Sequence, residues 1–508
     1  MRYGFALDQR TCIGCHACTV ACKTEHEVPV GQFRTWVKYV DKGTYPSSTR
    51  EFGVMRCNHC TDAPCIQICP TGALFKRPDG IVDFNNEACI GCKSCMQACP
   101  YDAIYIDEDT HTAAKCNMCA HRIDQGLEPA CVVVCPTESI WVGDLDDPKS
   151  AISVFIATSE VQVRAPEQNT KPNMFYVGAD HTVLEPLAAP MQDTYIWAKP
   201  DAHRADVAAD LPTDPTTGAY ASLNTAHPRP WGWRVTTYLW TKAWAAGAVM
   251  VAALAIVLGL DRQSYESVLA PAIGLFGAAV TGALLVWDLK RPERFLYIFL
   301  KSNFRSWLVL GAYMLTGFSG LAVLWIGAHL IGADGAVPWL AVVAALAGVV
   351  TAGYTGFLFG QAEGRDLLQS PLLFWHLIVQ ALMVGAGMAL IGAVASGADD
   401  RLRVLIVRVL VLSTALHLLM LLIEYGGKHA SRNAAAAAHM IVRGRYARLF
   451  WLGAVGLGVL AVLLALPAWS SPTGVALASA LVAGVLVQVA LLAYESVFVR
   501  AGQDVPLS

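Results

Sequence analysis

Cysteine is the residue type with the clearest chemistry in this sequence of 508 residues. All 16 cysteines lie in the first 135 residues and fall into four groups of four. Thiolates at short, repeated spacing are typical ligands of iron–sulfur clusters, and sixteen of them match the need of four [4Fe–4S] clusters. The groups are Cys12, Cys15, Cys18 and Cys22; Cys57, Cys60, Cys65 and Cys69; Cys89, Cys92, Cys95 and Cys99; and Cys116, Cys119, Cys131 and Cys135.

The first and third groups repeat the run Cys-x2-Cys-x2-Cys-x3-Cys. In such a run three cysteines enclose one face of a cluster, and the fourth binds the neighbouring cluster of a pair. Gly14 and Gly91 would let the backbone approach a cluster closely. Zinc is the alternative, because zinc sites also use Cys-x2-Cys pairs. A zinc site needs two such pairs rather than one continuous run, so iron–sulfur clusters are favoured.

The N-terminal segment and the overall charge bear on the surroundings of the protein. The first residues contain no apolar run of about 7–15 residues and no twin arginine, so we expect no secretory signal. The cysteines are then expected in a reducing compartment, where disulfides are their least favoured use. The formal net charge of −3 gives no reason to expect a nucleic-acid partner.

The cysteine pattern resembles that of the four-cluster, polyferredoxin-like electron-transfer subunits of molybdopterin oxidoreductases. Dimethyl sulfoxide reductase, nitrate reductase and formate dehydrogenase complexes contain such subunits. The likeness covers residues 1–198 and implies an α+β ferredoxin-like head. It also implies that the first group interlocks with the fourth and the second with the third. The implied ligand sets are Cys12, Cys15, Cys18 and Cys135; Cys22, Cys116, Cys119 and Cys131; Cys57, Cys60, Cys65 and Cys99; and Cys69, Cys89, Cys92 and Cys95.

The resemblance further implies a direction along the head. The cluster of Cys12 and Cys135 would face a separate molybdopterin catalytic subunit, and the cluster of Cys89 would face the membrane. Some relatives carry tryptophan at the position of Cys92 and bind a three-iron cluster there. Because this chain has cysteine, four irons are expected.

The rest of the chain contains the elements that must hold this head at a membrane. Residues 199–234 are rich in proline and are predicted to form a linker. Residues 235–500 are predicted to form an all-α bundle of about eight transmembrane helices, because a span needs about 20 mostly apolar residues. Residues 501–508 are predicted to be a C-terminal tail. The expected spans are 239–260, 267–287, 307–330, 338–359, 372–394, 404–424, 449–468 and 474–494.

Ionisable residues within or beside these spans are candidates for a quinone site, since charges are costly in lipid and often mark a pathway. Most of them fall near the face that carries the head, and His417 lies deeper. Each taken alone could instead be an interfacial side chain that reaches water. The proposed roles are proton exchange by Asp288, Glu363, His376 and Glu424, and contacts with quinone by Lys242, Arg291, Tyr425 and His417.

The membrane region also resembles a known family. The stretch Val286-Trp287-Asp288-Leu289-Lys290-Arg291-Pro292-Glu293-Arg294-Phe295 is similar to the signature loop of NrfD-type, polysulfide-reductase-like membrane anchors. That family is haem-free and exchanges electrons with quinones, so the resemblance implies ubiquinone or menaquinone as the partner and no haem. Relatives often carry head and anchor on separate chains, whereas here both are fused.

Loop charges predict the orientation. Lys and Arg are concentrated in the loops on the head side, as in Lys290, Arg291, Arg294 and Lys301, and are sparse on the other side. The positive-inside rule then places the head in the cytoplasm and the chain in the inner membrane. A catalytic partner exported through the twin-arginine route could instead carry the head outward.

These observations predict an electron-transfer and membrane-anchor subunit that works between a molybdenum or tungsten catalytic subunit and membrane quinone. A formate dehydrogenase complex is the first expectation, and sulfite, sulfur-compound or dimethyl sulfoxide-type complexes are alternatives. A second class is an energy-conserving, quinol-oxidising module, in which His417, Tyr354 and Arg408 would contribute to a proton path. The complex could also form a higher oligomer.

Overall fold

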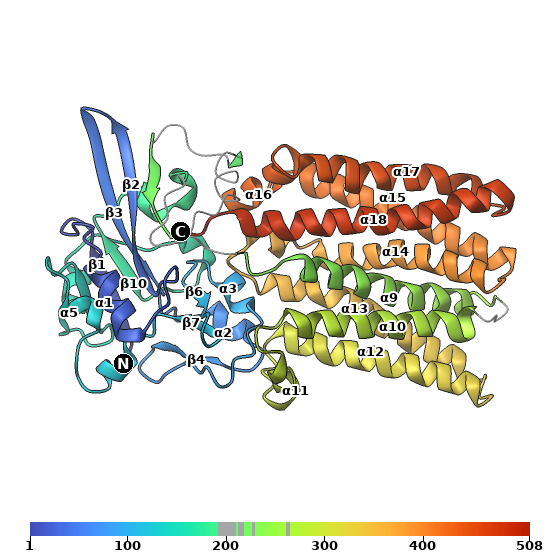
Figure 1. Ribbon diagram of the computed structural model, residues 1–508, viewed down its shortest axis with the longest axis horizontal. Helices are drawn as coiled ribbons and strands as arrows, with labels where there is room; N and C mark the ends of the chain where they lie inside the picture. The colour runs from blue at the N-terminus through green and yellow to red at the C-terminus, as the bar shows by residue number, and fades with distance from the viewer. Residues whose placement is uncertain (192–209, 212–217, 226–228, 261–264) are drawn as a thin grey trace.

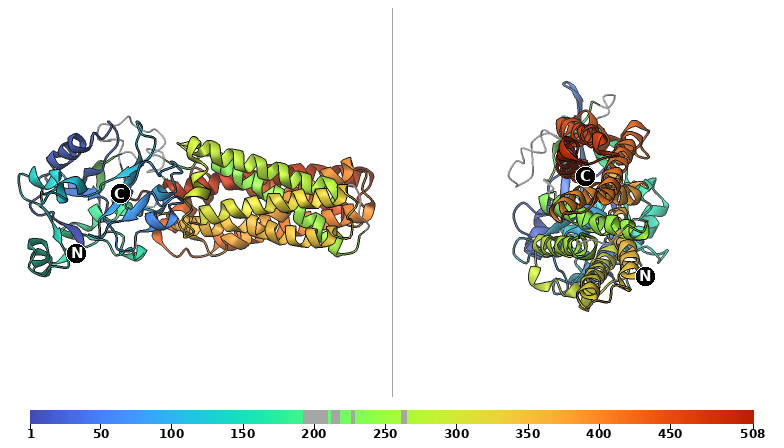
Figure 2. Two further views of the ribbon diagram at one scale, coloured as in Figure 1. Left: turned by 90° about the horizontal axis from the view of Figure 1, so that it is seen from below. Right: turned by 90° about the vertical axis from the view of Figure 1, so that its right-hand side faces the viewer.

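The computed structural model describes residues 1–191, 210–211, 218–225, 229–260 and 265–508. The chain forms two parts along one axis, a head of strands and short helices and a bundle of long helices (Figure 1). The two further views agree that the long helices run side by side away from the head (Figure 2). The predicted class, an α+β iron–sulfur head followed by an all-α membrane bundle, is confirmed.

Two sheets form the outer part of the head. One has the order β8-β1-β10-β9, with β1 parallel to β10 and antiparallel to β8. The other has the order β11-β2-β3 and is built on a long antiparallel hairpin. The strands are β1 (Tyr3–Asp8), β8 (Ile140–Asp144), β9 (Val161–Gln162), β10 (Met174–Val177), β2 (Thr35–Thr44), β3 (Ser47–Arg56) and β11 (Tyr220–Leu223).

Two small hairpins and a series of short helices hold the cysteines. The hairpins pair β4 (Leu74–Lys76) with β5 (Val82–Phe84) and β6 (Ile104–Ile106) with β7 (Ala113–Lys115). The helices are α1 (Ala17–His26), α2 (Pro64–Ile68), α3 (Ser94–Ala98), α4 (Ala120–Ile123), α5 (Ala130–Val133), α6 (Ala151–Ala157) and α7 (His181–Leu184), with 3-10 turns η1 (Pro166–Gln168) and η2 (Pro186–Ala188).

Among the described residues, eight helices are long and apolar enough to cross a membrane, which agrees with the predicted number of spans. They are α9 (Trp233–Val257); η3 (Tyr265–Leu269) continued by α10 (Ala270–Asp288); α12 (Trp307–Leu330); α13 (Val337–Gly360); α14 (Leu373–Ala395); α15 (Asp400–Gly426); η6 (Leu449–Gly456) continued by α17 (Leu457–Ala465) and η7 (Leu466–Ala468); and α18 (Gly474–Asp504). The connections facing the head contain η4 (Pro292–Arg294), α11 (Tyr297–Leu300), η5 (Asp366–Gln369) and α16 (Arg432–Val442).

The structure revises the two segments expected to lie outside the domains. Within 199–234, residues 199–209, 212–217 and 226–228 lie outside the described part, but β11 pairs with β2 and α9 already begins at Trp233. The expected tail 501–508 is not separate either, since α18 continues to Asp504 and the remaining residues pack at the junction with the head. Backbone pairing and burial therefore tie both segments to the fold.

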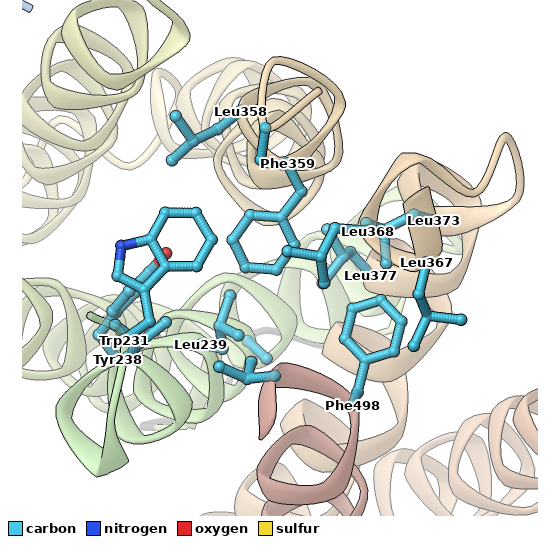
Figure 3. Close-up of a cluster of buried hydrophobic side chains, with 14 of the residues drawn as sticks. Trp231, Tyr238, Leu239, Leu358, Phe359, Leu367, Leu368, Leu373, Leu377 and Phe498 are labelled. Atoms are coloured by element: carbon cyan, nitrogen blue, oxygen red, sulfur yellow. The ribbon is translucent and has the colours of Figure 1, made fainter. Parts of the chain in front are cut away.

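An apolar cluster closes the end of the bundle next to the head (Figure 3). The ring of Phe359 stacks on Trp231, with centroids 5.2 Å apart, and on Phe498 on its other side. Tyr238 and Leu239 of α9 lie beside Trp231. This packing fixes α9, α13 and α18 against one another directly below the head, where the candidate site lies.

Candidate iron–sulfur and quinone sites

The four groups of cysteines come together across the sequence rather than within each run. Cys12, Cys15, Cys18 and Cys135 line one small cavity in the head. Cys69, Cys89, Cys92 and Cys95 line a second one. In both cavities three thiols come from one group and the fourth comes from a distant group, as expected for ligands that belong to interlocked cluster pairs.

The remaining cysteines form two more sets. Burial raises the pKa of the Cys22 thiol, and the negative charges of Cys116, Cys131 and Cys119 raise it further. The pKa of Cys65 is raised in the same way, by burial and then by the neighbouring thiolates of Cys99, Cys57 and Cys60. Thiolates crowded in an apolar interior need a bound cation, and metal binding displaces their protons.

These residues fit iron–sulfur clusters. In the described residues, no three His, Cys, Asp or Glu side chains come close enough to share one metal ion. A cluster, in contrast, is held by thiols that are spread around a cavity and bind separate iron atoms. Bound clusters of this kind supply one-electron transfer, while the protein supplies thiolates, burial and hydrogen bonds.

The loop that holds Cys89 and Cys92 packs directly on the membrane domain. The backbone N–H groups of Lys290 and Arg291 donate to the carbonyls of Gly91 and Ile90, each at 3.2 Å. Gly91 has φ +67°, and a Cβ atom there would lie 2.6 Å from Cβ of Lys290. Glycine is therefore needed for close approach to the membrane domain, and its backbone N–H also donates to Cys89 Sγ at 3.4 Å.

An apolar cavity of about 100 Å³ lies below this loop, between the head and helices α9, α10, α12 and α13. It joins a cysteine of the head to polar side chains of the membrane domain. Leucine, isoleucine and valine side chains form most of the remaining wall. Its principal residues are Cys92, Ser94, Trp231, Tyr238, Asp288 and Tyr354.

Asp288 lies at the boundary between this cavity and a larger one. The second cavity, of about 650 Å³, lies between the head and the membrane domain and is lined by ionisable residues that include Asp107, Glu108 and His111. Asp288 lines both cavities. Its carboxylate accepts a hydrogen bond of 2.7 Å from Lys93 Nζ, and Arg234 lies 3.9 Å away. The carboxylate therefore lies between a polar cleft and an apolar pocket.

Lys242 does not line the apolar cavity itself but contacts Tyr354, which does. Its ammonium group is completely buried, donates to Thr355 Oγ1 and lies 4.5 Å from the centre of the Tyr354 ring. Glu495 of α18 is also buried and interacts electrostatically with both Lys242 and Glu424. A polar chain of side chains therefore continues from the cavity into the bundle.

A histidine pair lies deeper along this series of polar side chains. His376 Nε2 and His417 Nδ1 are 2.8 Å apart, and His376 Nδ1 lies 3.5 Å from a carboxylate oxygen of Glu424. Tyr494 packs against both imidazole rings, and its hydroxyl lies 3.5 Å from that of Tyr425. Four of the predicted residues therefore form one group, in which His376 and His417 are buried and Glu424 and Tyr425 are partly buried.

Three other expected residues lie elsewhere. Arg291 donates to the carbonyl of Thr110 at 2.9 Å and pairs with Glu293, so it attaches the head to the membrane domain. Glu363 follows α13, where burial and the charge of Asp62 raise its pKa, and it does not line the apolar cavity. Arg408 is exposed and donates to the carbonyl of Trp469, which separates it from the buried histidines.

Sequence reasoning named Tyr354 and Tyr425 but missed Tyr238, Tyr494 and the position of Glu495. Tyr238 lies one turn before Lys242, and Tyr494 lies next to Glu495. The sequence predicts Glu495 just after the last span, but α18 extends nine residues beyond it. Gln488, Leu491, Glu495 and Phe498 recur at helical spacing, and this periodicity is the signal that could have extended the span.

Comparisons with known proteins find similarity in both the head and the membrane domain. Residues 221–506 match the family model described as polysulphide reductase, NrfD, and residues 49–145 match a 4Fe-4S dicluster domain. The protein is 42% identical over 200 residues to the B subunit of tetrathionate reductase from Salmonella typhimurium, covering 39% of this sequence and 80% of that protein. It is 40% identical over 179 residues to the B chain of polysulfide reductase from Wolinella succinogenes, covering 35% and 94%. The arsenate respiratory reductase iron-sulfur subunit ArrB of a Shewanella species is 35% identical over 225 residues, covering 35% and 96%.

Proposed function

Because this protein belongs to the polysulphide reductase NrfD family and joins that membrane domain to a 4Fe-4S electron-transfer head, we propose that it carries electrons between a separate catalytic subunit and quinone. Four [4Fe–4S] clusters, one for each cysteine set, would connect the two ends. The catalytic subunit would dock near Cys12 and Cys135, and quinone would react at the opposite end, below Cys92.

The apolar cavity at Cys92 carries this proposal. It contacts a proposed cluster ligand, lies at the head-side ends of four candidate spans and offers an acidic and two phenolic groups, at Asp288, Tyr238 and Tyr354. A quinone ring needs an apolar slot with a few placed hydrogen-bonding groups, as small-molecule sites generally provide. Electrons can arrive from the head side, while protons reach the same place through Asp288.

Each lining residue has a defined task in this proposal. The tyrosine hydroxyls donate hydrogen bonds to a quinone oxygen and orient the ring. Lys242, held against Tyr354, places a positive charge behind that hydroxyl and favours negative charge on the oxygen. Asp288 gives a proton to the reduced oxygen, or accepts one from quinol, and exchanges it with the polar cleft.

Filling the cavity tests the proposal. Ala312 lines it from α12, so Ala312→Phe should block quinol from reducing the head while dithionite still reduces it fully. Leu346→Phe adds the same ring on the exposed surface of α13 and should change nothing. The readout is the visible absorbance of the iron–sulfur head in detergent-solubilised complex. Normal reduction by quinol in Ala312→Phe would place the quinone site elsewhere.

The relatives favour a reductase as the catalytic partner, in place of the formate dehydrogenase expected from sequence. The three relatives named above are subunits of tetrathionate, polysulfide and arsenate reductases. We therefore propose a molybdenum or tungsten bis-pterin subunit that reduces a sulfur compound or a related oxyanion. Purification of the intact complex, metal analysis and an assay of these acceptors against formate would decide between them.

The cytoplasmic position of the head in an inner membrane is also part of the proposal. It is supported by the positive loops on the head side. A reporter fused after Ser508 would disturb buried packing, so the turn at Gly332, on the far face, is the better insertion site. Alkaline phosphatase placed there should be active, and an inactive phosphatase with an active cytoplasmic reporter would reverse the orientation.

Proton translocation is a second candidate function, favoured by the contact between His376 and His417. Together with Glu424 these residues extend the series of polar side chains from Lys242 toward the middle of the bundle. Quinol-driven acidification or alkalinisation of proteoliposomes, beyond that expected from the quinone reaction itself, would support translocation. If His417→Gln moves as many protons per quinol as the wild type, translocation through the histidine pair is excluded and only the electron-transfer function remains.

A further inference from the structure

Arg56 is a completely buried cation in the middle of the head. It ends β3, directly before Cys57. Its Nη1 atom donates to Cys131 Sγ at 3.2 Å, and its guanidinium carbon lies 4.5 Å from the centre of the Phe5 ring. Nε and Nη2 have no hydrogen-bond partner among the described residues. A fully desolvated guanidinium is costly unless negative charge compensates it nearby.

The compensating charge comes from cysteines. In the described part of the sequence no carboxylate forms an ion pair with Arg56, and the charges that act on it are those of Cys131, Cys116 and Cys18. Cys131 and Cys116 belong to the set that also contains Cys22 and Cys119. Cys18 belongs to the neighbouring set with Cys12. Arg56 therefore lies between two proposed clusters and touches a ligand of the inner one.

A second buried cation faces the same set. Lys115 is completely buried, and its ammonium group donates to the carbonyls of Val82 and Cys116, the latter at 2.9 Å. On the other side, His26 Nε2 lies 3.1 Å from Cys119 Sγ. The inner set is therefore flanked by two buried cations, Arg56 and Lys115, and by an imidazole nitrogen of His26. Such groups tune a metal site by stabilising its more negative state.

We propose that Arg56 raises the reduction potential of the cluster held by Cys22, Cys116, Cys119 and Cys131, and so makes this position an electron-accepting step within the head. Reduction adds one electron, from a neighbouring cluster or from dithionite, and breaks no bond. The added negative charge lies beside a permanent cation in a medium of low polarity, where the attraction is strong. The effect on the Cys12 cluster is weaker, because Arg56 does not touch its sulfur atoms.

This inference rests on the cluster-holding part of the proposed function, and a redox titration followed by electron paramagnetic resonance tests it. In the purified complex, Arg56→Gln should move one cluster signal to clearly lower potential, shift the Cys12 cluster less and leave the other two in place. Arg56→Lys keeps the positive charge on a shorter side chain, farther from the cluster, and should therefore give a smaller shift in the same direction. Arg50→Gln removes an exposed arginine from the same strand and should change no potential.

The outcomes separate the two hypotheses. If the wild type contains the clusters and Arg56→Gln leaves all their potentials unchanged, the role of Arg56 is overturned and the proposed function stays intact. Absence of any cluster signal from the wild type would instead overturn the proposed function. If Arg56→Gln binds too little iron to titrate, Arg56→Lys decides: a lowered potential supports the inference, and an unchanged potential overturns it.

Discussion

Lys93 of the head and Asp288 of the membrane domain form an ion pair of 2.7 Å between two residues 195 positions apart. Lys93 stands directly after Cys92, and Asp288 ends α10. Both side chains are largely buried. A single polar contact therefore links a proposed cluster loop to the wall of the proposed quinone cavity.

Asp288→Asn should slow quinone-linked turnover by about 10²-fold or more, because the amide has the same shape as the carboxylate and cannot exchange a proton. Dithionite should still reduce the head, since the cysteines are untouched. Steady-state oxidation of quinol by the complex measures the effect. Glu293→Gln, at an exposed position five residues later, is the control, and equal loss in both variants would contradict a direct role of Asp288.

Cys22→Ser and Cys18→Ser should damage different clusters, although both residues lie in α1. Cys22 lies near Cys116, Cys119 and Cys131, whereas Cys18 lines the cavity with Cys12 and Cys135. Electron paramagnetic resonance of the reduced complex should therefore lose or alter one signal in each variant, and not the same one. Loss of the same signal from both would mean that the first group binds one cluster by itself.

Arg365→Ala should loosen the head from the bundle. Its guanidinium donates to Gln97 Oε1 of the head and to the carbonyls of Gln503 and Val505, at 2.9–3.1 Å. Each buried acceptor left without a donor costs about 1–3 kcal/mol. The apparent melting temperature of the complex should fall, and protease should cut more readily between head and bundle. Arg403→Ala, at the far end of the bundle, should leave both measurements unchanged.

Lys38→Met should stabilise the head, and more so at pH 7 than at pH 10. Burial lowers the pKa of Lys38 to about 7, whereas an unfolded protein keeps the ordinary value near 10.5. Between these values only the unfolded state binds the proton, so the lysine destabilises the fold increasingly as pH falls toward 7. Melting temperatures at both pH values measure this. Lys42→Met, in the same strand but paired with Asp180, should show no such gain.

The cysteine sets and the eight spans could be predicted because each leaves a local or repeated pattern in the sequence. Cys12 and Cys135 are far apart, but the interlocked spacing of the family already implied their meeting. The spans were recognised from the length of their apolar stretches, and the predicted bounds differ from the observed helices at the helix ends. Lys242 and Glu495 lie within helices whose packing satisfies them, so composition alone placed the first at the edge of its span and the second outside it.

Docking of the head could not be predicted. The contact of Lys93 with Asp288, the approach of Lys290 to Gly91 and the buried hydrogen bonds of Arg365 depend on how two folded parts meet. No periodicity in the sequence records that surface. The same holds for Arg291, whose charge suggested a quinone contact but whose guanidinium binds a carbonyl of the head.

The loop between α11 and α12 is hydrogen-bonded to the backbone of the head. Asn303 donates to the carbonyl of Cys69 at 2.8 Å, and Ser306 donates to that of Ile68 at 2.7 Å. In the proposed function, the Cys89 cluster and the quinone cavity would thus be held at one separation, whatever the viscosity or crowding of the lipid. Electron transfer would then be tunnelling through a fixed gap, and only the arrival of quinone in the cavity would depend on diffusion.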